Sequence, residues 1–201
     1  MNNISRIILV TSLIGACLLV ALVLKGDIGT PIAYQDNRDT RPTTPFESSN
    51  TTSRYALLQA MADKGTVQFD LADARFGRPD IVRKDGAYYS IFMPAVSVLA
   101  MPLYILGQQY GMPQLLAFIT TSIFGVLNVW LIARISVRLG TSLGAGIMAG
   151  LVFLFGTSAL AYSLTLTQHV YGATLLLLMV LQTLYPISLW RNIVIGFLFG
   201  I

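Results

Sequence analysis

Long apolar runs without a charged residue dominate this sequence. The first run, residues 7–24, holds 18 residues and no charge, close to the roughly 20 residues that an α-helix needs to cross a bilayer. Apolar residues make up 55% of the 201 positions and charged residues only 11%, about half the charged fraction of an average soluble domain. The sequence therefore predicts an all-α polytopic membrane protein.

The charged residues are unevenly placed. The stretch 25–85 contains all nine acidic residues and nine of the thirteen basic ones, so it is neutral. The remaining four positive charges are arginines at the ends of apolar runs: Arg6, Arg134, Arg138 and Arg191. Because basic residues flank membrane spans on the cytoplasmic side, this surplus indicates membrane topology, and no nucleic-acid partner is expected.

The apolar runs fit one topology if the stretch 91–108 does not cross the membrane. Pro94 and Pro102 interrupt it, and each removes a backbone donor that lipid cannot replace, so we expect a juxtamembrane helix there. The predicted layout is one membrane domain, 1–201. It begins with a span at 7–24, an outer loop at 25–90 and the juxtamembrane helix at 91–108. Spans follow at 114–133, 143–160 and 169–187, and another span starts at 192–201.

This layout has consequences for location and completeness. It places the N-terminus and the four arginines in the cytoplasm, and the long loop on the extracytoplasmic face of the cell membrane. The last apolar run stops after about nine residues, fewer than a span requires. We therefore expect the chain to be the front part of a longer protein.

The outer loop has local folding signals. Residues 53–64 show a helical pattern with Ser53 as a possible N-cap and Gly65 just past the end, and their apolar residues share one face. This predicts a short amphipathic helix on the bilayer surface. Residues 66–71 alternate like a strand, and Asp85-Gly86 is a two-residue hairpin signal. Long loops are usually functional or disordered, and these signals favour function.

Few known catalytic patterns fit this loop. Nothing matches a P-loop, a dinucleotide fingerprint, a nucleophile elbow or a zinc-ligand spacing, and with one His and one Cys neither a metal nor a cofactor is expected. What remains is a set of acids and bases: Asp36, Asp39, Glu47, Arg54, Arg83 and Lys84. A carboxylate can activate a nucleophile, and cations can hold a phosphate leaving group. The alternative is a solvated, self-compensating charged surface.

Three stretches of the chain carry a family resemblance. ESSNTTSRYALLQAMADKGTVQFD at 47–70, DIVRKDGAYYS at 80–90 and MPAVSVLAMPLYILG at 93–107 resemble the first outer loop of GT-C fold glycosyltransferases. The likeness is to the dolichyl-phosphate-mannose mannosyltransferase and aminoarabinose transferase-like groups, and Gln168-His169 resembles a similarly placed His. The resemblance implies a GT-C-like helix bundle that transfers a sugar, with inversion, from a polyprenyl-phosphate carrier to a lipid, glycan or protein acceptor.

The resemblance also implies site residues. The base is an acid of the first outer loop, for which the choices here are Glu47, Asp39 and Asp36. The substrate and its carrier phosphate are assigned to Arg54, Arg83, Lys84, Tyr89 and His169. The chain departs from the family where Thr51 and Thr52 replace an Asp-Glu pair of many relatives, and where Ile91-Phe92 follow Ser90 in place of Asp-Lys.

A non-catalytic membrane component, such as a transporter half or an assembly partner, is the competing interpretation. Transporters usually bury ionisable residues near mid-membrane. None of Asp, Glu, Lys or Arg falls inside a proposed span, which favours the transferase.

Overall fold

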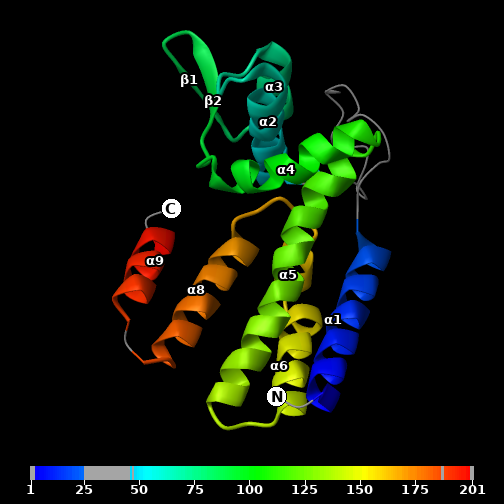
Figure 1. The fold of residues 1–201 in the computed structure, drawn as a ribbon. Helices are drawn as coiled ribbons and strands as arrows, with labels where there is room; N and C mark the ends of the chain where they lie inside the picture. Colours follow the sequence, from blue (N-terminus) through cyan, green and yellow to red (C-terminus); the bar gives the residue numbers. More distant parts are fainter. Residues whose placement is uncertain (1–2, 25–45, 47, 187, 200–201) are drawn as a thin grey trace. The chain divides into compact units, whose positions relative to one another are not determined.

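The computed structural model describes residues 3–24, 46, 48–186 and 188–199. These residues are mostly helical (Figure 1), which confirms the helical fold class. The elements are α1 (Asn3–Val23), α2 (Ser49–Lys64), α3 (Leu71–Phe76), β1 (Ile81–Lys84), β2 (Ala87–Ser90), α4 (Ala95–Gln109), α5 (Pro113–Arg138), α6 (Leu143–Gly156), α7 (Ala159–Ser163), α8 (His169–Thr183) and α9 (Leu189–Phe199).

The chain forms two compact units. Unit 1 comprises residues 1–23, 122–163 and 169–201, and unit 2 comprises residues 24–121 and 164–168. The boundary runs through α5, whose first turns belong to unit 2. Segment 164–168 therefore joins the loop region of unit 2 although it comes much later in the chain.

Helix length separates the apolar helices into two groups. Two described helices, Arg6–Val23 and Pro113–Arg138, are long and apolar enough to cross a membrane. α6 and α8, at positions predicted to span, have 14 and 15 residues. α6 ends where the Thr157 hydroxyl donates to the Phe153 carbonyl at 2.6 Å and accepts from the Ala159 amide at 3.1 Å, and α7 follows as a separate helix.

Glycines bring α6 close to α5 within unit 1. A Cβ atom on Gly150 would lie 2.6 Å from the Val129 carbonyl oxygen, and one on Gly146 would lie 3.0 Å from that of Ala133. Gly146 and Gly150 form a small-xxx-small pair, a spacing that lets two helices approach closely. The second such pair behaves differently: Gly196 has no atom within 4 Å of its Cβ position, and Gly200 lies outside the described residues.

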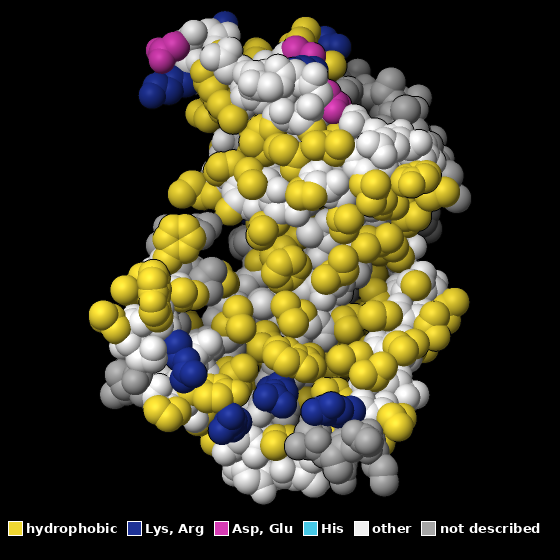
Figure 2. Space-filling view, viewed as in Figure 1, with side chains coloured by type: hydrophobic (Ala, Val, Ile, Leu, Met, Phe, Trp, Pro, Cys, Tyr) yellow, Lys and Arg dark blue, Asp and Glu magenta, His cyan; other side chains and the backbone are white. Residues whose placement is uncertain are grey.

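Packing in unit 1 sets the relative directions of its helices. Leu9 of α1 packs with Ala133 of α5 and Ile147 of α6, and Ile135 of α5 packs with Leu181 of α8. The end of α5 therefore lies beside the starts of α1 and α6 and the end of α8. As a result, four arginines gather at one end of unit 1: Arg6, Arg134, Arg138 and Arg191. Elsewhere the helices of this unit carry mostly apolar side chains on the face that Figure 2 shows.

α2 is the central helix of unit 2. It begins at Ser49, and every residue from Thr51 to Ala60 is buried. The prediction of an amphipathic surface helix that starts after Ser53 is therefore wrong. Ser53 lies inside the helix, where its hydroxyl donates to the Asp80 carbonyl at 2.7 Å, so distant segments cover the faces that the pattern assigned to solvent. The predicted end is confirmed, because Gly65 adopts the left-handed conformation with φ 64°.

The segments after α2 follow the prediction in part. Residues 66–71 do not form a strand, since only Phe69 makes an isolated bridge, to Tyr88. Asp70 instead caps α3, accepting from the Asp73 amide at 2.8 Å. The hairpin is confirmed: β1 pairs antiparallel with β2, and Asp85 and Gly86 both have positive φ, 51° and 83°, as a type I′ turn requires.

α4 packs against α2 through polar contacts. The Ser97 hydroxyl donates to the Arg54 carbonyl at 2.8 Å, and the Tyr104 hydroxyl donates to the Asp63 carboxylate at 2.8 Å. Burial and the neighbouring Asp63 carboxylate raise the pKa of Tyr104, so this hydroxyl remains a donor. The helix predicted at 91–108 begins later, at Ala95, with Pro94 as its N-cap.

Candidate functional site

Arg54 is the buried cation of unit 2. It lies on α2 and is 3% exposed. Its Nη1 donates to the Asn50 carbonyl at 3.4 Å, its Nη2 donates to Oε1 of Gln168, and its Cζ lies 3.8 Å from the centroid of the Phe92 ring. Its Nε is buried and has no hydrogen-bond partner. The side chain is thus held on three sides, and its Nε–H donor is unused.

The charge of Arg54 is only partly compensated. Burial lowers the pKa of Arg54 to about 10, against the attraction of Asp80, so the guanidinium stays protonated at neutral pH. No carboxylate oxygen of the described residues lies within 4.0 Å of it. A buried charge is costly unless a partner of opposite charge accompanies it, so this position favours an anion.

Unpartnered oxygen atoms occur on the same two segments as Arg54 and Gln168. Asn50 Oδ1 and Thr51 Oγ1, in the first turn of α2, and Thr167 Oγ1, beside Gln168, are buried without a hydrogen-bond partner. Buried polar atoms are nearly always paired, and threonine hydroxyls can donate as well as accept. We define the Arg54 site by six residues: Asn50, Thr51, Arg54, Phe92, Thr167 and Gln168.

The other predicted phosphate-binding residues of unit 2 are not buried with Arg54. Arg83 and Lys84 are exposed on β1, and the Arg83 guanidinium lies 5.6 Å from the Tyr88 ring centroid. The Tyr89 hydroxyl accepts a hydrogen bond from Gln68 Nε2 at 3.1 Å. Of the three predicted cations in this unit, only Arg54 has a buried environment that suits a bound phosphate.

The predicted catalytic carboxylates, Asp36, Asp39 and Glu47, all lie outside the described residues. Thr51 and Thr52, which replace the acids expected from the resemblance, are fully buried on α2. Across the described parts of the chain, no three His, Cys, Asp or Glu side chains gather as metal ligands would.

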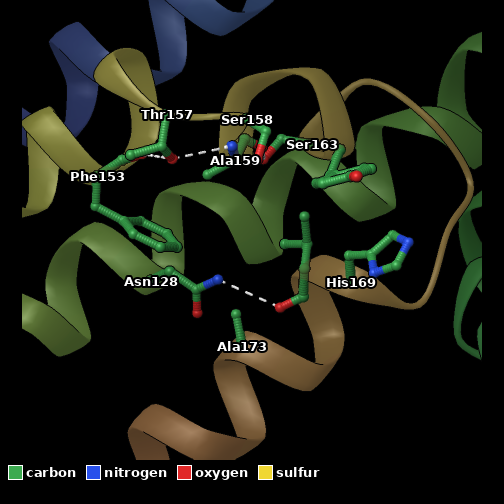
Figure 3. Close-up of a pocket in the computed structure, with 10 residues that line it drawn as sticks. Asn128, Phe153, Thr157, Ser158, Ala159, Ser163, His169 and Ala173 are labelled. Atoms are coloured by element: carbon green, nitrogen blue, oxygen red, sulfur yellow. Dashed lines mark hydrogen bonds between the residues drawn. The ribbon is translucent and has the colours of Figure 1, made fainter.

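His169 lies in unit 1, at a separate pocket of about 150 Å³ (Figure 3). It is the exposed first residue of α8, and its ring centroid lies 4.3 Å from that of Tyr162. Asn128 also lines this pocket. Its Nδ2 donates to the Val170 carbonyl at 3.3 Å and its Oδ1 accepts from Thr174 at 2.7 Å, so Asn128 bonds α5 to α8.

Five residues of the Arg54 site had no predicted role: Asn50, Thr51, Phe92, Thr167 and Gln168. Asn50 and Arg54 are four residues apart, so helical periodicity alone puts them on one face. The family resemblance includes Gln168 only as the residue before His169. No local pattern predicts that it meets Arg54, 114 positions earlier in the chain.

Comparisons of the chain with known protein families, with curated proteins and with solved structures give no match.

Proposed function

We propose that this chain belongs to a GT-C-type membrane glycosyltransferase, which moves a sugar from a polyprenyl-phosphate carrier to a lipid, glycan or protein acceptor on the extracytoplasmic face of the cell membrane. The observation that carries the proposal is the buried Arg54 guanidinium, whose Nε has no partner and which has no carboxylate of the described residues within 4.0 Å. The sequence resemblance supports the same activity.

The membrane location is supported by unit 1. α1 has large apolar side chains that face outward, with Ile7 64% and Leu22 81% exposed. An apolar surface of this kind on a long helix suits contact with lipid. Unit 1 has no Asp or Glu in its sequence, and its four arginines lie at one end, as expected for the cytoplasmic ends of spans.

The phosphate assignment is supported by the donors of the Arg54 site. A guanidinium presents N–H groups in a planar fork that matches phosphate oxygens, and the hydroxyls of Thr51 and Thr167 can add donors. The Arg54 site also includes the first turn of α2, and the N-terminal end of a helix favours a negative charge. These features suit a phosphate that carries one or two negative charges.

In the proposed reaction, Arg54 binds the leaving phosphate. The acceptor hydroxyl oxygen attacks the anomeric carbon, the bond from that carbon to the phosphate oxygen breaks, and the carrier phosphate leaves with the bonding electrons. A carboxylate takes the hydroxyl proton, and Glu47, Asp39 and Asp36 stay the predicted bases. Arg54 stabilises the charge that develops on the leaving phosphate.

Sugar transfer by the complete protein in vesicles, from labelled polyprenyl-phosphate sugars, tests the proposal. Arg54→Gln should lower the transfer rate by roughly 100-fold or more, since removing one donor to a developing charge has effects of that order. Lys84→Gln, which changes an exposed cation of the same unit, is the matched control. Glu47→Gln, Asp39→Asn and Asp36→Asn identify the base.

Three outcomes are informative. Transfer lost with Arg54→Gln but kept with Lys84→Gln supports the proposal. Equal rates in both variants would remove Arg54 from the reaction. The wild-type protein could also retain the carrier and transfer no sugar from any donor of the panel. That result would refute the proposed transferase activity and favour a non-catalytic membrane component.

A further inference from the structure

Three arginines and a tyrosine gather at the end of unit 1. The Cζ atoms of Arg138 and Arg191 lie 4.0 Å and 5.0 Å from the centroid of the same ring, that of Tyr185. Arg134 lies one turn before Arg138 on the same face of α5. We call these residues the Tyr185 cluster: Arg134, Arg138, Tyr185 and Arg191.

Nothing in unit 1 neutralises this cluster. The sequence of the unit contains no Asp or Glu, and like charges four residues apart on a helix repel each other. The C-terminus of α5 offsets part of the charge, because a helix end carries about half an electron charge. Three guanidinium groups therefore keep a net positive charge that no acidic residue of unit 1 balances.

The cluster has donors to spare for an anion. Cation–π contact with Tyr185 uses the ring face, and the Tyr185 hydroxyl accepts hydrogen bonds from Arg138 and Arg134. Each guanidinium carries five N–H donors, so these bonds leave further donors on both arginines. Of the Arg191 donors, Nη1 is used by the Pro186 carbonyl at 3.2 Å. Two helices thus present guanidinium N–H groups around one ring, and a phosphate group has the charge and the acceptor oxygens that they require.

We infer that the Tyr185 cluster binds the phosphate of an anionic phospholipid headgroup. Apolar and aromatic side chains beside Arg191 support a lipid as the source, because Leu189 and Trp190 are 77% and 75% exposed. Tryptophan and arginine at one helix end are typical of a membrane interface, and basic clusters between helices bind anionic headgroups there. This site requires the proposed membrane location but not the proposed sugar transfer.

A specific lipid site at the Tyr185 cluster would require arginine, whereas a topology signal requires only positive charge. Positive flanks orient a helix whether the residue is Lys or Arg, whereas a fork that stacks on a ring and donates two hydrogen bonds requires Arg. The double variant Arg138→Lys/Arg191→Lys keeps the charge and should lose the lipid. The double variant Arg138→Gln/Arg191→Gln should lose it too.

The test is retention of lipid by the full chain, purified from bilayers of equal parts phosphatidylglycerol and phosphatidylcholine and measured by native mass spectrometry. Wild type should retain phosphatidylglycerol over phosphatidylcholine by roughly tenfold, as expected if each arginine near the headgroup contributes appreciably. Arg6→Gln, which removes a charge at the same end of unit 1 but outside the cluster, should keep this preference.

Three results would overturn the inference. The first is equal retention of both lipids by wild type, which needs no variant and so does not depend on whether a variant folds. The second is full preference in the double lysine variant, which would reduce the cluster to a topology signal. The third concerns the thermal stability of the protein in detergent. If inorganic phosphate raises it as much as phosphatidylglycerol does, free phosphate is the ligand.

Discussion

Units 1 and 2 place their polar residues differently. In unit 1 the charged side chains lie at one end, and buried polar groups such as Asn128 and Thr174 bond to each other. In unit 2 two charged side chains are buried. Arg54 is buried on α2, and Asp73 is buried in an ion pair with Lys64 at 2.6 Å. Unit 1 keeps its charged side chains at one end, and unit 2 stabilises charges that it encloses.

The difference has a functional meaning. Paired polar groups such as Asn128 and Thr174 hold helices of unit 1 together. Among the described residues of unit 1, the buried side-chain atom without a partner is an acceptor, Gln182 Oε1, whereas the Arg54 site of unit 2 leaves a buried donor, Arg54 Nε, unused. Unused buried donors cost stability, so they mark positions where another requirement outweighs folding. We therefore expect substitutions in unit 1 to change stability most, and those at the Arg54 site to change activity most.

The largest stability effect is expected from Gly150→Ala. The new methyl group would lie 2.6 Å from the Val129 carbonyl oxygen, so α6 must move away from α5. Overpacking of this kind costs about 1–3 kcal/mol. Unfolding in mixed detergent micelles measures the loss. Gly196→Ala is the control because no atom lies within 4 Å of that site, and an equal loss in both variants would contradict close packing of α5 with α6.

Asn128→Leu should have the next largest effect. It removes the bonds to Val170 and Thr174 and leaves two buried groups without that partner, at a cost of about 1–2 kcal/mol. Hydrogen exchange followed by mass spectrometry should show faster exchange in α8, with α2 unchanged. If α2 and α8 respond alike, the two units do not unfold separately.

Tyr104→Phe tests the polar packing of unit 2. Losing the hydrogen bond to Asp63 at 2.8 Å should lower stability by about 1 kcal/mol, seen as faster exchange in α2 and α4. Tyr110→Phe serves as the control because Tyr110 is 69% exposed and its hydroxyl makes no hydrogen bond with the described residues. A control variant that loses as much as Tyr104→Phe would count against the contact between α2 and α4.

The smallest effect expected is a pH dependence of unit 2. The hydrogen bond from Lys64, and then that from the Asp73 amide, hold the pKa of Asp70 below its usual value of 3.8. Since the folded value is the lower one, this contribution is complete above about pH 4 and is lost as the pH falls through the lowered pKa. Asp70 is 55% exposed, so solvent keeps the effect below about 0.5 kcal/mol.

Lys64→Met checks this assignment. The variant should flatten the fall in stability of α2 and α3 between about pH 4 and pH 2, measured by thermal unfolding in detergent. A fall that is as steep as in wild type would mean that other groups in unit 2 carry the acid sensitivity.

Local rules were sufficient for several elements. Asp85-Gly86 determines the hairpin because only a few residues adopt positive φ, and Gly65 ends α2 for the same reason. The hydropathy of 7–24 and of α5 likewise predicted long apolar helices. Each of these follows from interactions within a few residues or from composition, which the sequence displays directly.

Tertiary structure decided the burial of α2 and the composition of the Arg54 site. The apolar pattern of α2 has one face, yet the chain covers its polar faces as well, because Asp80, Ser90 and Ser97 supply hydrogen bonds from distant segments. Arg54 and Gln168 meet across 114 positions. A contact between residues so far apart depends on how whole helices pack, and no periodicity or spacing in the sequence records it.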